Sequence, residues 1–254
     1  MTSEIEKKKR NLDEAFVYTY NYSWIRDKLI MHELTLNCFD DFLKLLYDKT
    51  DFKFRDDQRE GYFLMTKIDS IASVVKYSED LAAISIGFGK GHFKINETLR
   101  KYKVKEIKDF FQQVASADYD YIRKILGYPG LSAVELERKE SMLQSVEQAK
   151  QYFGQIRNFY EKNMDLYNCY KHGLRIMPTC DEDKQWMLLK FPSLKNGEFD
   201  LEGFEKKEVD ENHEEALKIV GLIVTLMEVI FRKHRSLYFN RGKKFECLVV
   251  APNK

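Results

Sequence analysis

The chain has few of the residues that cross-link or interrupt a small fold. Its 254 residues include 4 cysteines, 4 prolines and 12 glycines. The cysteines, Cys38, Cys169, Cys180 and Cys247, form no C-x-x-C pair, which excludes a paired zinc knuckle and a dense disulfide framework. The scarcity of turn residues argues against a sandwich of short strands and favours long helices. The sequence therefore predicts reduced thiols, a cytoplasmic location and a mainly α fold.

The chain also lacks an excess of one charge and a long hydrophobic run. Lys and Arg total 42 against 41 Asp and Glu, so any binding to nucleic acid must come from a local patch. The most apolar segment, "IVGLIVTLMEVIF" at 219–231, has 13 residues and contains Glu228. A membrane-spanning helix needs about 20 apolar residues. We therefore expect a core helix there and no membrane contact.

Several signatures of enzymes and cofactor sites are missing. The sequence contains no G-x-S-x-G, no H-E-x-x-H, no Walker loop and no dinucleotide-binding fingerprint after a strand. None of the 5 histidines has a second histidine at ligand spacing. The glycine-rich "GFGKGHFKIN" at 87–96 follows a helical pattern and has no G-K-[S/T], so a connection between helices is favoured over a phosphate loop. We predict no metal and no cofactor.

What the sequence does contain is helical periodicity. Apolar residues recur every three or four positions from Leu64 to Ile86, which predicts one long packed helix. A second long helix is expected over 133–172 and a third over 211–238. Residues 104–126 predict a further helix, and 13–46 predict about two more. The expected fold is a bundle of about five or six helices.

Three short runs predict a small antiparallel β-sheet beside the helices. "LRIMP" and "QWMLLKF" are strand-like and separated by the polar "TCDEDK", so a β-hairpin is expected around 174–191, with strands at 174–177 and 186–191. "FECLVV" predicts a third strand at 245–250. No linker or repeat is visible, so residues 1–254 are expected to form one helical domain with these β elaborations.

The stretch "LYNCYKHGLRIMP" at 166–178 contains the strongest candidate site. Asn168 and His172 are four residues apart at the end of the predicted helix and share a face at the edge of the core. With Lys171 and Arg175 beside them, the histidine is placed to act as an acid or base near neutral pH, while the cations stabilise a phosphate. The alternative is structural: the two polar side chains cap the helix while Lys171 faces its dipole.

A second candidate is the densest basic patch, in "FRKHRSLYFNRGKK" at 231–244. Arg232, Lys233, Arg235 and Arg241 are candidate nucleic-acid contacts, and nearby aromatic side chains offer stacking surfaces for bases. The alternative is again structural, because cations near the C-terminal end of a helix stabilise its dipole.

Two helical segments carry a resemblance to a known family. The arrangement of "SIASVVKYSEDLAAISIGF" and a later helix closing in "NFYEKNMDLYNCYKHG" resembles the HEPN (higher eukaryotes and prokaryotes nucleotide-binding) superfamily of helical bundles, and in particular bacterial members with an Asn-x-x-Lys-His-Gly motif. The resemblance implies an RNA- or nucleotide-binding protein of a bacterial stress or antiphage system. It also implies a homodimer in which the faces bearing Asn168 and His172 approach each other.

Family members that cut RNA resemble one another in an Arg and a later His with four to six residues between them, and they use no metal. In this chain the positions of that Arg hold Asp165, Leu166 and Tyr167, and Arg175 is the nearest cation that could replace it. The resemblance therefore leaves two functions open. One is RNA or nucleotide binding, with metal-independent ribonuclease activity in the catalytic form. The other is a non-catalytic helical interaction or scaffold protein.

Overall fold

The computed structural model describes residues 4–51, 53, 55–90, 94–171, 176–178, 185–189 and 204–239. The chain divides into two compact units. Unit 1 comprises Met1–Ser23, Tyr77–Asn158 and Gly221–Lys254, and unit 2 comprises Trp24–Lys76 and Phe159–Val220. Helices α4, α8 and α9 each contribute residues to both units.

The described residues are mainly helical, as the sequence predicts. Within them the α-helices are α1 (Glu4–Thr19), α2 (Trp24–Asn37), α3 (Phe39–Lys49), α4 (Asp56–Gly89), α5 (Ile95–Lys101), α6 (Val104–Ser116), α7 (Tyr119–Ile125), α8 (Leu136–Lys171) and α9 (Val209–Phe239). A short 3₁₀ turn, η1, covers Leu131–Ala133. No helix in this described part is long and apolar enough to cross a membrane.

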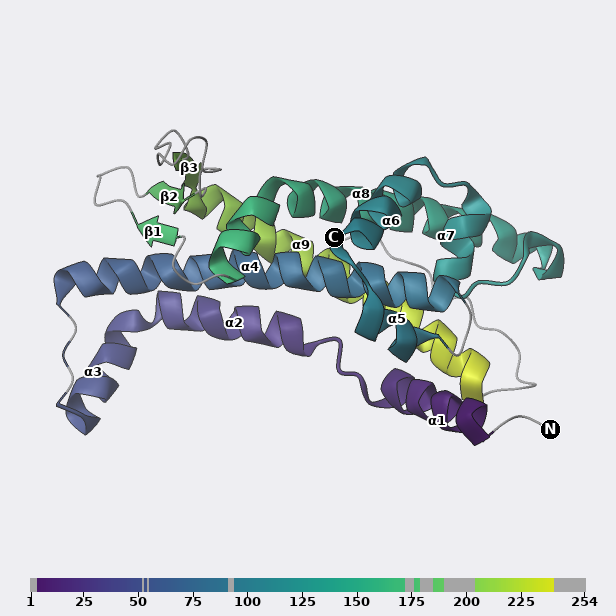
Figure 1. Cartoon of the computed structure of the whole chain (residues 1–254), viewed down its shortest axis with the longest axis horizontal. Helices are drawn as coiled ribbons and strands as arrows, with labels where there is room; N and C mark the ends of the chain where they lie inside the picture. Colours follow the sequence, from purple (N-terminus) through teal and green to yellow (C-terminus); the bar gives the residue numbers. More distant parts are fainter. Residues whose placement is uncertain are drawn as a thin grey trace, which may run out of the picture. The chain divides into compact units, whose positions relative to one another are not determined.

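Unit 2 is built on α2 and the first part of α4, which lie alongside each other (Figure 1). Ile25 and Leu29 put one face of α2 into the core, and Ile68 and Ile71 do the same for α4. The start of α2 is set by a local turn in which the Asn21 side chain accepts a hydrogen bond from the Ser23 backbone N–H at 3.1 Å. This packing presents Lys28 and His32 of α2 to the polar residues of α4.

Unit 2 also holds a three-stranded antiparallel sheet of order β1-β2-β3. Its strands are β1 (Ile176–Pro178), β2 (Gln185–Leu189) and β3 (Phe204–Glu208). Strand β1 pairs with β2, with Met177 opposite Met187. Strand β3, of sequence FEKKE, was not expected, because charged residues dominate it. The strand predicted at 245–250 lies outside the described residues.

Unit 1 packs around an aromatic cluster on α9. The fully buried Phe231 ring lies 5.2 Å from the Tyr20 ring and 5.8 Å from the Phe88 ring, measured between centroids. Beside it, the His234 ring stacks on Phe88 at 3.7 Å, and its Nε2 lies 3.1 Å from the Ile125 carbonyl oxygen. These contacts tie α9 to α4, to α7 and to the segment after α1.

The helix predicted over 104–126 is two helices, α6 and α7. The break comes at Asp118, whose carboxylate accepts a hydrogen bond from the Tyr121 backbone N–H at 2.9 Å and so caps α7. Helix α7 ends at Ile125, and Gly127, two residues further on, has a φ of +70° that allows the closing turn. The predicted segment 13–46 likewise spans parts of α1, α2 and α3.

Candidate functional site

The C-terminal turn of α8, residues 168–171, carries the described part of the first candidate site. We call this turn the α8 end; it belongs to unit 2. Cys169 is buried on its inner side, as is Leu166 one turn earlier. Asn168 and Lys171 are exposed on its outer side, whereas the predicted site residues His172 and Arg175 lie outside the described residues. The two described members of the site are therefore open to a ligand from solvent.

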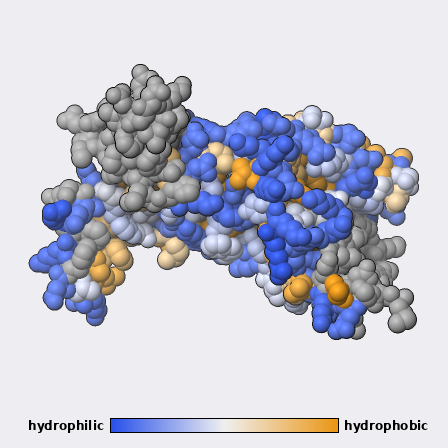
Figure 2. All heavy atoms as spheres, in the orientation of Figure 1, coloured by the Kyte–Doolittle hydropathy of each residue, from blue (hydrophilic) through white to orange (hydrophobic). Residues whose placement is uncertain are grey.

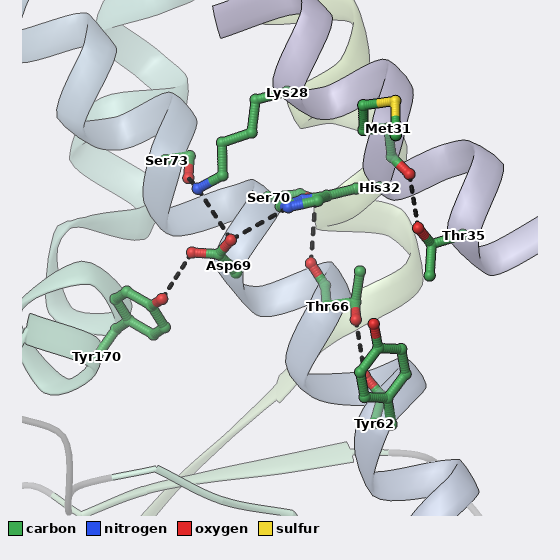
Figure 3. Close-up of polar contacts among 10 residues, drawn as sticks. All are labelled: Lys28, Met31, His32, Thr35, Tyr62, Thr66, Asp69, Ser70, Ser73 and Tyr170. Carbon is green, nitrogen blue, oxygen red and sulfur yellow. Dashed lines mark hydrogen bonds and ion pairs between the residues drawn. The ribbon is translucent and has the colours of Figure 1, made fainter. Parts of the chain in front are cut away.

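Tyr170 anchors the α8 end to α4. Its hydroxyl donates a 2.6 Å hydrogen bond to Oδ1 of Asp69, which lies in the middle of α4 (Figure 3). A hydrogen bond to a carboxylate is stronger than a neutral one, and this one joins residues 101 positions apart. Tyr170, which lies between Asn168 and Lys171 in the sequence, therefore holds in place the turn that presents these two residues.

Asp69 is the centre of a polar group that we call the Asp69 cluster, formed by Lys28, His32, Asp69 and Tyr170 (Figure 3). The Lys28 ammonium lies 2.9 Å from Asp69 Oδ2 and donates a 2.7 Å hydrogen bond to the Ser73 hydroxyl. Nε2 of His32 lies 3.3 Å from the same carboxylate oxygen. One carboxylate thus holds side chains from α2 and α8 against α4.

The proton on His32 depends on the neighbouring Ser70. Nδ1 of His32 lies 2.8 Å from the Ser70 hydroxyl, which also lies 3.0 Å from the Thr66 carbonyl. If the hydroxyl donates to Thr66, Nδ1 must be the donor to Ser70, and the ring is then either the neutral Nδ1–H tautomer, with an unprotonated Nε2 facing Asp69, or the imidazolium. If the hydroxyl donates to Nδ1 instead, the ring is neutral and its Nε2–H faces Asp69. The cluster can therefore accept a proton by rotating one hydroxyl.

Burial and charge set the acidities in the cluster. Burial lowers the pKa of His32 below its ordinary 6.5, and Lys28 adds to this, while Asp69 and Glu33 oppose it. Burial alone would raise the pKa of Asp69, but the hydrogen bonds from Tyr170 and Lys28 and the charge of Lys28 bring it below 3.8. Burial and the bond to Asp69 raise the pKa of Tyr170 to about 12. At neutral pH the group is a carboxylate with one fixed cation, Lys28.

A second charged pair, of a buried histidine and a partly exposed glutamate, lies in the same unit. Nε2 of His213 on α9 is 3.2 Å from Oε1 of Glu33 on α2, without the orientation of a hydrogen bond. Burial lowers the pKa of His213, more than Glu33 raises it. Within the described part of the chain, no group of three His, Cys, Asp or Glu side chains is placed to hold a metal ion.

The residues of the predicted basic patch differ in how far they are exposed to solvent. Arg232 is exposed and pairs with Glu228, whereas Lys233 is buried with its ammonium 5.7 Å from the centroid of the Tyr128 ring. The Arg235 guanidinium donates a 2.7 Å hydrogen bond to the Val17 carbonyl. Arg241 lies outside the described residues. The described three belong to unit 1, while Asn168 and Lys171 belong to unit 2.

No motif in the sequence pointed to Lys28, His32 or Asp69. One signal was present. Lys28 and His32 are four residues apart on the face of α2 that also carries the buried Ile25 and Leu29. Two ionisable side chains on a core-facing stripe need a buried partner, and the partner is Asp69.

Comparisons with models of protein families, with curated proteins and with solved structures found no match.

Proposed function

We propose that this chain is an HEPN-like RNA- or nucleotide-binding protein of the bacterial cytoplasm and that the α8 end contacts the phosphates of its ligand. The observation that carries the proposal is the exposure of Asn168 and Lys171 on a turn that Tyr170 anchors to Asp69. An ammonium group and an amide on a fixed turn supply a charge and a hydrogen-bond donor to a phosphate group. The resemblance at "NMDLYNCYKHG" supports the choice of ligand.

Binding without catalysis is the form that we favour, because the Arg of the family's cleaving members has no equivalent here. In a catalytic form, His172 takes the proton of a ribose 2′-hydroxyl, and the resulting oxygen attacks the adjacent phosphorus. The bond to the 5′-oxygen then breaks, and that oxygen takes up a proton. Lys171 and Arg175 would stabilise the charge on the phosphate during this step.

The test is the affinity of the whole protein for a labelled single-stranded RNA of mixed sequence. Lys171→Glu should weaken binding by about 3- to 10-fold, because a single lysine–phosphate contact is lost. The slope of the logarithm of the binding constant against the logarithm of the salt concentration should fall by about one. Fluorescence anisotropy at several salt concentrations measures both. Lys108→Glu on α6, another exposed lysine, is the matched control and should leave binding unchanged. Equal loss in both variants would point to non-specific attraction and against the site.

The same samples distinguish the two forms of the proposal when the RNA is analysed on a gel after incubation with a metal chelator. Cleavage that persists with the chelator and disappears in His172→Ala identifies a metal-independent ribonuclease. Intact RNA with Lys171-dependent binding identifies the non-catalytic form. No binding and no cleavage would leave the alternative, a helical interaction protein, which the exposed apolar surface of α2 and α3 favours.

A further inference from the structure

A pocket, which we call the α5 pocket, lies within unit 1 between the end of α4, helix α5 and the start of α6. Its volume is about 390 Å³, and small-molecule sites usually measure roughly 300 to 1,000 Å³. Three lysines line it: Lys90 directly after α4, Lys94 directly before α5 and Lys101 at the end of α5. Figure 2 shows hydrophilic surface over α5. The pocket therefore has the size and the polarity for a small charged ligand.

The segment around the α5 pocket carries an excess of positive charge. Residues 90–106 include six Lys or Arg and two Glu, whereas the whole chain has 42 Lys or Arg against 41 Asp or Glu. Arg100, Lys103 and Lys105 are exposed beside the three pocket lysines and add to their field. The local field therefore attracts an anion, although the chain as a whole is almost neutral.

The two glutamates of the segment, Glu97 and Glu106, also line the pocket but hold its lysines only loosely. Nζ of Lys101 lies 3.1 Å from Oε1 of Glu97, and Nζ of Lys90 lies 3.9 Å from Oε1 of Glu106. All four side chains are at least 45% exposed, and exposed ion pairs contribute little to stability. Glu106 is also engaged elsewhere, because its Oε2 accepts a 2.8 Å hydrogen bond from the Lys103 backbone N–H. Both ammonium groups can therefore turn to an anion in the pocket at small cost.

Thr98 is the residue in the pocket that points most clearly to a ligand. It lines the pocket although only 8% of it is exposed. Its backbone is fully used, because its N–H donates to the Lys94 carbonyl and its carbonyl accepts from the Tyr102 N–H, both at 2.9 Å. Its hydroxyl, by contrast, has no hydrogen-bond partner among the described residues. A polar group in so buried a residue is expected to have a partner, and the pocket is where one can bind.

The other threonines show that this state is unusual for the chain. Each of the other five described threonines donates its hydroxyl to the carbonyl four residues earlier, at 2.8 or 2.9 Å, which is the ordinary arrangement in a helix. They are Thr19, Thr35, Thr50, Thr66 and Thr225. Thr98 has the equivalent carbonyl, that of Lys94, yet its hydroxyl does not bond to it. The hydroxyl is therefore left available to a ligand in the pocket.

We propose that the α5 pocket binds an oligophosphate, whose oxygens accept hydrogen bonds from the Thr98 hydroxyl and from the ammonium groups of Lys90, Lys94 and Lys101. All four groups can donate, and the oxygens of an ionised phosphate accept. Three cations around one pocket match consecutive phosphates better than a single carboxylate, because the phosphate chain carries several negative charges. Such a chain is offered equally by a nucleoside triphosphate and by a free polyphosphate.

This site is separate from the α8 end. The α5 pocket belongs to unit 1 and the α8 end to unit 2. The proposal also does not depend on RNA binding. Lys171→Glu should therefore leave oligophosphate affinity unchanged, and a protein that fails to bind RNA can still bind an oligophosphate.

Isothermal titration calorimetry of the full chain with sodium tripolyphosphate, at constant ionic strength, tests the proposal. The wild type is expected to bind it saturably with a dissociation constant below about 100 µM. Thr98→Val keeps the shape of the side chain and removes the hydroxyl, so it should raise the dissociation constant by about 3- to 10-fold. Lys94→Gln, at an exposed position, should raise it by about the same factor, because one charge is lost.

Each variant has a matched control outside the pocket. Thr225→Val removes a hydroxyl that donates to the Gly221 carbonyl, and Lys108→Gln removes a charge from an exposed position of α6 that does not line the pocket. Both controls should stay within about 2-fold of the wild-type dissociation constant. Thermal melts check the fold of every variant. If Thr98→Val melts well below the wild type, the comparison of Lys94→Gln with Lys108→Gln decides.

A second titration with a nucleoside triphosphate identifies the source of the phosphates. Tighter binding than tripolyphosphate means that the base contributes as well, and the Tyr102 ring in the pocket wall is placed to contact it. Equal affinity means that the pocket recognises the phosphate chain alone.

Absence of saturable tripolyphosphate binding up to about 1 mM overturns the proposal. A folded Thr98→Val that binds as tightly as the wild type overturns it too, because the hydroxyl then makes no contact with the ligand. Equal weakening in Lys94→Gln and Lys108→Gln has the same consequence, because the general field of the basic segment, and not the pocket, would then attract the anion.

Discussion

Replacement of Phe231 by Ala should lower the free energy of unfolding by about 3 to 5 kcal/mol, the range for deletion of a buried aromatic ring. Its side chain is fully buried in unit 1, and among the described residues four aromatic rings lie next to its ring. These are Phe16, Tyr20, Tyr22 and Phe88, at centroid distances of 5.9, 5.2, 5.9 and 5.8 Å. The lost free energy comes from the buried apolar area and the ring–ring contacts that disappear. A cavity adds to the loss, because the closely packed rings around position 231 cannot move in to fill it completely.

Urea unfolding followed by far-ultraviolet circular dichroism measures this effect. Leu136→Ala is the control, because that side chain is 82% exposed and its removal should change the free energy by no more than about 0.5 kcal/mol. A loss below about 1 kcal/mol for Phe231→Ala would mean that the aromatic cluster does not hold α9 in unit 1 as described.

Replacement of Asp69 by Ala should cost about 2 to 4 kcal/mol, because the change leaves two partly buried groups without their acceptor. The Lys28 ammonium, with a side chain 31% exposed, would lose its counter-charge, and the Tyr170 hydroxyl would lose its 2.6 Å acceptor. Asp69→Asn keeps an oxygen that can accept from Tyr170 but removes the charge opposite Lys28. We therefore expect about half the loss for Asp69→Asn.

The pH dependence separates this effect from a packing defect. The pKa of Asp69 in the fold lies below its ordinary 3.8, so the unfolded chain binds the proton more readily. The stabilisation is therefore complete above about pH 4 and is lost as the pH falls further. The difference between wild type and Asp69→Ala should be constant at neutral pH and shrink in acid. Glu4→Ala, at an exposed ion pair, should show neither effect, and a difference that persists unchanged at pH 2 to 3 would contradict the electrostatic explanation.

The long helices could be predicted because their apolar spacing is regular. The stripe from Leu64 to Ile86 lies within α4, and the segments 133–172 and 211–238 correspond closely to α8 and α9. Breaks were harder to predict where a single capping side chain decides them, as Asp118 does between α6 and α7. Strand β3 was missed because pairing with β2, rather than its own composition, makes FEKKE a strand.

The candidate site could be predicted only in part, because its members come from distant segments. Asn168 and Lys171 stand in one short stretch, whereas Asp69 meets Tyr170 across 101 positions. The residue pattern around either position does not indicate such a long-range contact. The burial of Lys233, by contrast, could have been predicted from the sequence. It follows the buried Leu226 by seven residues, which places it on the same apolar stripe of α9.

The central claim, that RNA contacts the α8 end, is tested most directly by lysine acetylation of the wild-type protein with and without saturating single-stranded RNA, read out by mass spectrometry. This requires no variant and so cannot be confused with a folding defect. We expect RNA to slow modification of Lys171 several-fold while modification of Lys108, which is also exposed, proceeds unchanged. Modification of Lys171 at the same rate with and without bound RNA would contradict the account.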